Sequence, residues 1–282
     1  MPSVHPCGRA RPPTPPSKGT RHHAHHGLPG RLPCWLDLGS ADIPASAAFY
    51  QDVFGWTFHS LGEEAGGYGY LRHDGSTVAA IGALTEQGAT PAWMIYFQVP
   101  DADATAKTAE QHGGTVRAEP FDVMSEGRMA QLSDPAGVQF ALWQPGNTKG
   151  LDKVGGPGSF CWAELHTADP AAAVPFYRAL FGWRTETVEM PGMNYVVLSP
   201  AEGDQQATSL GGIAPLQGDR EPVRWVPYFE VEDVDATLDR AAAGGGAVMM
   251  AGSDVPGVGR LGWATDPHGV VFAVIRSDMP QS

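Results

Sequence analysis

Acidic, imidazole and aromatic side chains that could do chemistry lie together in two short segments of the chain. Trp35 is followed by Asp37, and Trp162 is followed by Glu164 and His166. If these segments are strands, side chains two residues apart share a face. An acid against an apolar wall has a raised pKa and can serve as a general acid or base. Asp37, Glu164 and His166 are therefore candidate catalytic residues.

The position of His166 allows two interpretations. A carboxylate can orient a neighbouring imidazole and raise its pKa, which would make Glu164 and His166 a pair. Side chains at i and i+2 on a strand, however, are roughly 7 Å apart, so a direct bond between them is marginal. The spacing favours a histidine at the rim of the sheet.

Both segments belong to an internal duplication. The run Cys34–Leu38 reads Cys-Trp-Leu-Asp-Leu and returns at 161–165 as Cys-Trp-Ala-Glu-Leu. At one constant offset, each run is followed by a capping aspartate, a Phe-Tyr pair and Phe-Gly-Trp. Chance does not reproduce four landmarks at one spacing, so the chain contains two copies of one unit.

Within each copy, the hydrophobic pattern predicts the same order of elements twice. Apolar residues alternate over 34–38, which predicts a strand. Asp42 then caps a helix over 45–54 that Gly55 ends, and three strands follow at 56–59, 68–72 and 77–84. The pattern restarts at 93–99 and runs to 143. The fold class is therefore α+β, with four βαβββ units in tandem.

This pattern divides the chain into a first domain at 33–145, a linker at 146–159, a second domain at 160–276 and a tail at 277–282. Residues 1–32 are rich in Pro, Arg and His and almost lack large apolar side chains, so we predict that they are disordered. The histidines at 22, 23, 25 and 26 suit a solvated tail, and they would also suit a metal-scavenging tract.

The composition excludes several classes of partner. A formal net charge of -13 disfavours nucleic acid or an anionic membrane, because both need a basic face. No apolar run reaches the roughly 18 residues of a membrane span, and no apolar segment follows the basic N-terminus as in a secretory signal. The 3 cysteines, two of them inside predicted strands, do not make a disulfide framework. These features together predict a cytoplasmic protein.

Four βαβββ units in tandem, with Asp-Pro-x-Gly at 134–137 and 266–269 before the last strand of each pair, resemble the vicinal oxygen chelate superfamily. This group contains glyoxalases, bleomycin-resistance proteins and extradiol dioxygenases. Cys-Trp at the start of each copy and Phe-Gly-Trp after its first helix are similar to a two-domain actinobacterial subgroup named glyoxalase-like or "hydroxylase". The resemblance spans about Leu32 to Ile275, and it implies two tandem half-barrel domains, each a pair of units that curls around a cup.

In the metal-using branches of this superfamily, the resemblance implies a metal held inside the cup by His and carboxylate side chains from three strands. Counting from the shared landmarks places these positions at Trp35, Met94 and Ala141, and in the second copy at Trp162, Val226 and Ala273. None of these side chains binds Zn, Fe or Mn. We therefore expect no cofactor, and a divalent metal only if another site replaces the family's, which argues against the usual glyoxalase and dioxygenase chemistry.

Aromatic and polar side chains should line the cups instead. A wall of aromatic rings with one acid and one phenol suits a flat, partly aromatic small molecule. In the alternative, the tryptophans fill a closed core and the acids stay solvated at its rim. The candidates for ligand binding are Trp35, Trp162, Met94 and Trp143, and the phenols of Tyr96 and Tyr228 join the candidate catalytic groups.

Arg128 and Arg260 follow a glycine at equivalent sites before the last hairpin of each domain. An arginine can bind a carboxylate or phosphate through two parallel hydrogen bonds, so both are further ligand-binding candidates. The same side chain suits a turn carbonyl or a surface acid, and this structural use is favoured. The Asp-Pro-x-Gly motifs are turns rather than catalytic acids.

The sequence supports a metal-independent protein that holds an apolar or aromatic metabolite or an antibiotic-like compound in an aromatic-walled cup. The alternative is an enzyme: a glyoxalase-like lyase or isomerase, or a cofactorless acid–base catalyst acting on reactive carbonyl or polyketide-like substrates, including a hydroxylase-associated role in secondary metabolism. A structural protein with filled cups is a third hypothesis. The chain would act as a monomer with an internal pseudo-two-fold axis, or as a homodimer.

Overall fold

The computed structural model describes residues 32–84, 86, 88–190, 192–205, 208–216, 218 and 222–278. The predicted N-terminal disorder and the His-rich tract therefore lie outside the described residues, apart from Leu32. Within the described ranges, none of the helices has the length and apolarity needed to cross a membrane.

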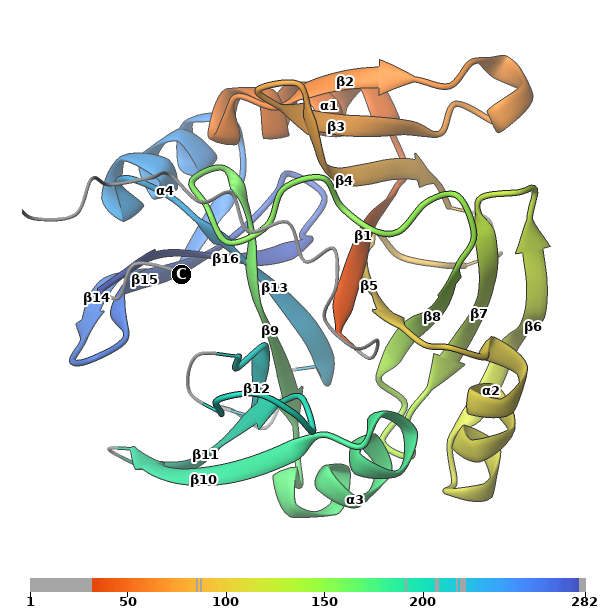
Figure 1. Ribbon diagram of the computed structural model, residues 1–282. Helices are drawn as coiled ribbons and strands as arrows, with labels where there is room; N and C mark the ends of the chain where they lie inside the picture. The colour runs from red at the N-terminus through yellow and green to blue at the C-terminus, as the bar shows by residue number, and fades with distance from the viewer. Residues whose placement is uncertain are drawn as a thin grey trace, which may run out of the picture.

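Each half of the chain forms one curled, eight-stranded sheet with two α-helices (Figure 1), which confirms the α+β fold of four βαβββ units. The first half contains β1 (Pro33–Ser40), α1 (Ile43–Phe54), β2 (Thr57–Ser60), the 3₁₀ turn η1 (Glu63–Ala65), β3 (Gly69–His73), β4 (Ser76–Ala83), β5 (Ala92–Gln98), α2 (Ala102–Gln111), β6 (Thr115–Val123), β7 (Gly127–Ser133) and β8 (Gln139–Pro145). Its strands lie in the order β2-β3-β4-β1-β5-β8-β7-β6.

The second half repeats this arrangement. It contains β9 (Ser159–Thr167), α3 (Pro170–Phe181), β10 (Arg184–Met190), β11 (Met193–Ser199), β12 (Gly211–Pro215), β13 (Arg224–Glu230), α4 (Val234–Ala243), β14 (Ala247–Val255), β15 (Gly259–Thr265) and β16 (Val271–Ser277). The order is β10-β11-β12-β9-β13-β16-β15-β14. The central pairs β1–β5 and β9–β13 are antiparallel, whereas β5–β8 and β13–β16 are parallel.

An aspartate N-cap begins each α-helix of the described chain. The Asp42 carboxylate accepts a hydrogen bond from the Ala45 amide at 3.0 Å, and aspartates cap α2, α3 and α4 in the same way. Gly55 and Gly182 end α1 and α3 at φ of 74° and 65°, in the left-handed region where a side chain is disfavoured. The repeated capping residues therefore determine where these helices begin and end.

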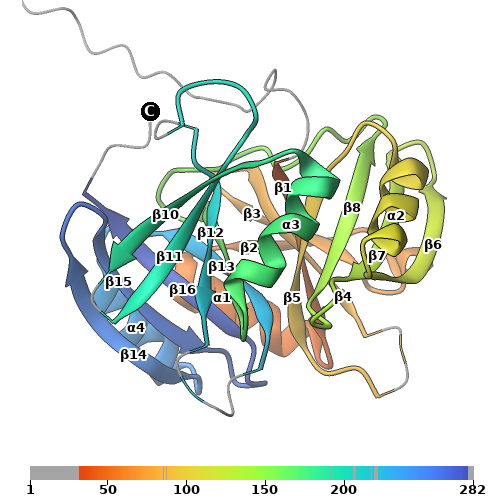
Figure 2. The same ribbon diagram turned by 90° about the horizontal axis from the view of Figure 1, so that it is seen from below.

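The helix-covered faces of the two sheets pack against each other in one continuous hydrophobic core. Helix α1 contacts α4, α2 contacts α3, and β5 lies against β13. Figure 2 shows α2 lying over β7 and β8 on this side of the first sheet. The opposite faces of the two sheets carry smaller clusters around Tyr96 and Tyr228. We call these faces the first cup, on β1, β5 and β8, and the second cup, on β9, β13 and β16.

Aromatic side chains of each half pack against aromatic side chains of the other half. Phe54 and Trp56 each pack against Phe229 of the second half with ring centroids 5.1 Å apart. In the equivalent arrangement, Phe181 lies 5.1 Å and Trp183 5.3 Å from Phe97 of the first half. Because the rings of each half complete the core of the other, the two domains form one folding unit.

The Asp-Pro-x-Gly motif is a turn, and it also joins the halves. Asp134 Oδ1 accepts hydrogen bonds from the amides of Ala136 and Val138 at 2.9 and 2.8 Å, as turn chemistry requires. Its Oδ2 accepts a bond from the Tyr177 hydroxyl of the second half at 3.1 Å. Burial raises the pKa of both groups, so the bond joins two polar groups that are shielded from water.

The segment that connects the domains is bound along the first half. The Leu151 amide donates to the carbonyl of Cys34, and the Asp152 carboxylate accepts from the amide of Thr77, both at 2.9 Å. The indole nitrogen of Trp56 donates to the Gly158 carbonyl at 2.8 Å. The connection is therefore an ordered part of the shared core rather than a free tether.

Candidate ligand sites

Cross-strand register brings the candidate residues of the first cup together. Trp35 lies opposite Tyr96, which lies opposite Ala141, and Asp37 lies opposite Met94 in the next row. Leu36, Ile95 and Leu142 alternate with them and belong to the core on the other face. The period-two pattern of each strand therefore sorts the sequence into a core face and a cup face, as predicted.

Asp37 is the centre of a hydrogen-bonded cluster in the first cup. Its Oδ1 accepts from the Trp35 indole nitrogen and from the Tyr68 hydroxyl, both at 2.8 Å. Its Oδ2 accepts from the Tyr96 hydroxyl at 2.7 Å. Trp35 also packs edge-on against Tyr70, with ring centroids 5.7 Å apart. The cluster places one half-buried carboxylate at the base of an aromatic wall.

Burial dominates the electrostatics of this cluster. It raises the pKa of Asp37, although the bonds from Tyr96, Tyr68 and Trp35 oppose the shift by stabilising the charged form. Burial and the nearby Asp37 charge raise the pKa of Tyr96 and Tyr68, so both phenols stay protonated donors. A carboxyl group with a raised pKa between two phenols can hold or move a proton on a bound molecule.

Glu164 takes the same place in the second cup. Its Oε2 accepts from the Tyr195 hydroxyl at 2.7 Å, and its Oε1 accepts from the Tyr228 hydroxyl at 2.8 Å. The indoles of Trp162 and Trp263 donate to these hydroxyls, at 3.0 Å to Tyr195 and 3.1 Å to Tyr228. Each half therefore builds one acid held by two tyrosines, with tryptophan support.

The prediction of a rim position for His166 was wrong. Its side chain is only 1% exposed, and its Nε2 lies 2.8 Å from Oε1 of Glu164. The extra methylene of glutamate and the lean of side chains along a strand close the gap that i, i+2 spacing alone leaves open. Glu164 and His166 are therefore a buried pair.

Trp143 and Met94 lie in the first cup, as the alternation predicted. Met94 packs against the cluster around Tyr96, and Trp143 is part of it. The Trp143 indole nitrogen donates to the carbonyl of Thr148 at 2.9 Å, in the segment that leads to the second half. Its ring is 8% exposed, so Trp143 forms part of the floor of the cup rather than its opening.

The ligand-binding role considered for Arg128 and Arg260 does not agree with the structure. Arg128 donates to both Asp103 oxygens at 2.6 and 2.8 Å and to Asp122 at 3.0 Å. Arg260 pairs in the same way with Asp235 and Asp254. Asp103 and Asp235 lie on α2 and α4, on the helix-covered side of each sheet. Both arginines pair with surface acids, the structural use that the sequence favoured.

Four aromatic members of the two cups were not predicted from the sequence: Tyr68, Tyr70, Tyr195 and Trp263. Tyr68 and Tyr195 each stand 31 residues after the acid that they contact, so the duplication carried a signal for this pair. Trp263 has no aromatic equivalent, because Gln131 pairs with Ala141 where Trp263 pairs with Ala273. The repeat therefore offered no signal for Trp263.

The residues present do not fit the metal that the resemblance implies. The three strand positions carry Trp, Met or Val, and Ala, and a single carboxylate stands at the centre of each hydrogen-bonded cluster, Asp37 in the first cup and Glu164 in the second. In the second cup, as far as the described residues show, the one imidazole is that of His166, and it contacts the Glu164 carboxylate. Across the described parts of the chain, no three His, Cys, Asp or Glu side chains come close enough to hold a metal ion. The clusters offer indoles and phenols instead. A phenol binds a metal only after it loses its proton, and burial raises the pKa of Tyr96 and Tyr228, which keeps both protonated.

The two cysteines at equivalent positions are free thiols. Cys34 and Cys161 stand at the irregular step where each first strand pairs with its neighbour, and they belong to the cup clusters. Burial raises the pKa of both thiols, which leaves them protonated and poorly nucleophilic. They fill space in the cup walls.

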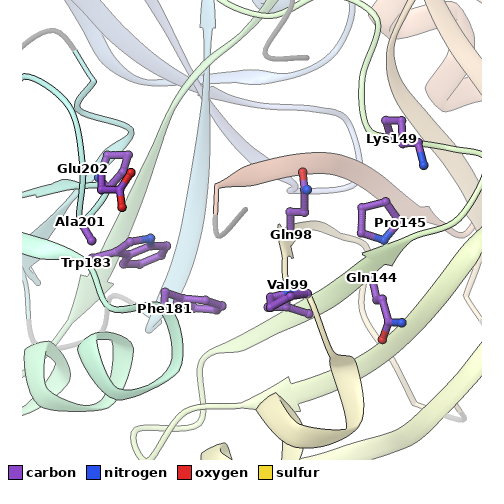
Figure 3. A pocket seen from close by; sticks show the side chains of 11 residues that line it. Gln98, Val99, Gln144, Pro145, Lys149, Phe181, Trp183, Ala201 and Glu202 are labelled. Atoms are coloured by element: carbon purple, nitrogen blue, oxygen red, sulfur yellow. The ribbon is translucent and has the colours of Figure 1, made fainter. Parts of the chain in front are cut away.

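A hollow of about 630 Å³ separates the halves at one side of the molecule (Figure 3). Gln98 and Gln144 line it from the first half, and Trp183 and Glu202 line it from the second. It contains no member of either carboxylate cluster. The hollow is therefore distinct from both cups.

Replacing Gly212 with alanine is expected to displace Tyr195 from Glu164. A Cβ built on Gly212 overlaps the Tyr195 phenol, which lies flat across β12. Overpacking of this kind costs about 1–3 kcal/mol of unfolding free energy, measurable by urea denaturation. Gly218→Ala is the control, because a Cβ there meets nothing within 4 Å. Equal stability of the two variants would show that Tyr195 is not held in this position.

Comparisons with known proteins agree with this architecture. The model of the Glyoxalase/Bleomycin resistance protein/Dioxygenase superfamily matches residues 34–142 and 160–274. The chain is 38% identical to the anthracycline biosynthesis protein DnrV of Streptomyces peucetius, over 86% of this chain and 92% of that protein. It is 35% identical to CFP32 of Mycobacterium bovis, provisionally named a glyoxylase, over 86% and 94%.

Solved structures share the fold at low sequence identity. The Mn(II)-bound glyoxalase of Novosphingobium aromaticivorans superposes with a TM-score of 0.59 at 19% identity, covering 89% of this chain and 86% of that one. A 2,2',3-trihydroxybiphenyl 1,2-dioxygenase of Sphingomonas wittichii gives a TM-score of 0.63 at 16% identity, covering 88% and 91%. With two matched domains and relatives that span nearly the whole chain, this protein belongs to the glyoxalase/bleomycin resistance protein/dioxygenase superfamily.

Proposed function

We propose that this protein binds a flat, largely apolar small molecule of aromatic character in a cup, without the help of a metal ion. The observation that carries the proposal is the Asp37 cluster. One carboxylate, three N–H or O–H donors and a tryptophan face take the place where a metal-using cup needs three ligands.

The exposure of the first cup supports a ligand over a closed core. Trp35, Asp37, Tyr70 and Met94 are all partly exposed, although each points to the same face as the buried Tyr96. A tryptophan and a tyrosine set edge-on give a flat ring both a stacking face and a side wall. A half-buried carboxylate then fixes the orientation of one polar group.

The name of one relative agrees with a ligand of this shape. DnrV is named an anthracycline biosynthesis protein, and it matches this chain across both domains. We therefore favour a fused-ring aromatic compound of secondary metabolism, either as a bound intermediate or as a sequestered product.

A second candidate function is acid–base catalysis on such a compound. The observation that favours it is the raised pKa of Asp37 beside two protonated phenols. Asp37 would carry the proton, and Tyr96 and Tyr68 would orient it, on a substrate with an ionisable carbon or oxygen next to a carbonyl. The provisional naming of CFP32 as a glyoxylase is in line with chemistry on a carbonyl compound.

The test is a thermal-shift and fluorescence screen with naphthols, flavonoids and anthraquinones. At least one compound is expected to raise the melting temperature and quench tryptophan emission. Trp35→Ala should abolish the shift, whereas Arg128→Ala, on the opposite face of the sheet, should keep it. If no compound in the panel shifts the melting temperature of the parent protein, the proposed function is wrong.

A further inference from the structure

The two cups differ at positions that the duplication relates to each other. Two residues after its acid, the first cup has Gly39 and the second has His166. Opposite the alanine of the last strand, the first cup has Gln131 and the second has Trp263. The first cup therefore has a glycine and an amide where the second has two rings.

These two rings close the second cup. His166 and Trp263 pack with ring centroids 4.7 Å apart, directly beside Glu164. His166 contacts Oε1 of Glu164, and Trp263 donates to the Tyr228 hydroxyl that bonds the same oxygen. Glu164 is 8% exposed and His166 1%. The acid of the second cup is thus enclosed by the chain's own side chains.

The first cup lacks this closure. A methyl group of Leu84 lies 3.1 Å from where a Cβ would stand on Gly39, and the hydrogen-bond partners of Asp37 among the described residues are Trp35, Tyr68 and Tyr96, none of them a histidine. Met94 is partly exposed, whereas its equivalent in the second cup, Val226, is fully buried, and Trp35 and Trp162 are both partly exposed. Asp37 is therefore the more exposed of the two acids.

The donors around Asp37 limit what such a ligand can present. Oδ1 accepts two hydrogen bonds, from Trp35 and Tyr68, whereas Oδ2 accepts one, from Tyr96. A carboxylate oxygen accepts about two, so within the described residues one site remains on Oδ2. A phenolic hydroxyl fits this site whether Asp37 is ionised or protonated. It can donate a hydrogen bond to the Asp37 carboxylate, and it can accept one from the Asp37 carboxylic acid.

We infer that the first cup alone takes the ligand, and that it recognises a fused-ring phenol whose hydroxyl bonds to Oδ2 of Asp37. The second cup is a copy that its own side chains close. This inference rests on the proposed function and adds the location of the site and the polar group that it recognises.

The experiment is a calorimetric titration with 2,6-dihydroxyanthraquinone, whose hydroxyls lie too far from the ring carbonyls to bond them, and with its dimethyl ether. The parent protein is expected to bind one dihydroxy compound per chain and to bind the ether at least about tenfold more weakly. Asp37→Asn should lower the affinity for the dihydroxy compound by a similar factor. Glu164→Gln should leave affinity and stoichiometry unchanged. Trp162→Phe, which keeps an aromatic ring in the second cup, should do the same and covers the case in which Glu164→Gln fails to fold.

The outcomes separate this inference from the proposed function. Two molecules per chain, or weaker binding in Glu164→Gln or Trp162→Phe with Asp37→Asn unaffected, would overturn the assignment to the first cup while small-molecule binding stands. Equal affinity for the phenol and the ether would overturn recognition of the hydroxyl. If neither these probes nor the wider aromatic panel bind, the proposed function itself fails.

Discussion

Replacing Trp56 with alanine is expected to lower the unfolding free energy by about 3–5 kcal/mol, the range for a large aromatic side chain removed from a core. Trp56 is fully buried and stacks on Phe54 with ring centroids 4.7 Å apart. It also packs on Phe229 of the second half and donates to the Gly158 carbonyl. One substitution therefore opens a cavity, leaves a buried carbonyl without its donor and weakens the contact between the domains.

The measurement is urea denaturation followed by far-UV circular dichroism. The shared core predicts that both halves unfold in one transition, in the parent and in the variant. Trp56→Phe keeps most of the buried area and should lose less than the alanine variant. Phe121→Ala, at a ring that is 46% exposed, should change the unfolding free energy by less than about 0.5 kcal/mol. Two separate transitions in the parent would contradict the single core.

The duplication made most of the fold predictable. Four capping aspartates and two helix-ending glycines recur at fixed spacing, so the elements could be placed without reference to their packing. Alternation along each strand then separated the cup face from the core face. The packing of α1 on α4 was not predictable, because contacts between two copies depend on surfaces that no local pattern encodes.

The candidate site was predictable only along single strands. Asp37 and Tyr96 were found because their strands are neighbours and their register follows from shared landmarks. Tyr68 reaches Asp37 from the loop before β3, and its ring lies 2.9 Å from where a Cβ would stand on Gly82. A contact of this kind depends on how a loop leans over a neighbouring strand. The period of two that identified the other members carries no information about it.

For the two arginines, the alternation along the strand was a better guide than the residue type. Their residue type suits an anion site, but Arg128 and Arg260 alternate onto the face that α2 and α4 cover. The same period of two that placed Asp37 in the cup also determines their face. Residue type alone suggested a ligand site, and position on the strand decided against it.

Replacing Asp37 with asparagine is expected to weaken ligand binding about tenfold or more without a matching loss of stability at neutral pH. Burial raises the pKa of Asp37, so the folded chain binds this proton more tightly than the unfolded chain. The contribution of Asp37 to stability is therefore full below the unfolded pKa of about 3.9 and is lost as pH rises through the folded pKa. Above that range, Asp37 is ionised in the folded protein, and burial of its charge lowers the unfolding free energy. Asparagine has no charge and avoids this loss of stability.

Unfolding free energies of the parent and Asp37→Asn, measured from pH 4 to pH 7, test this expectation. The unfolding free energy of the parent minus that of Asp37→Asn should be largest at pH 4 and should fall as pH rises. The neighbours of the carboxyl are the neutral phenols of Tyr68 and Tyr96, which stay protonated over this range because their own pKa values are raised. Asp52→Asn removes the same unit of charge at an exposed site on α1 and corrects for net charge. If this difference in unfolding free energy instead grows as pH rises, the ionised carboxylate stabilises the cup. Asp37 would then serve to hold the fold rather than a ligand.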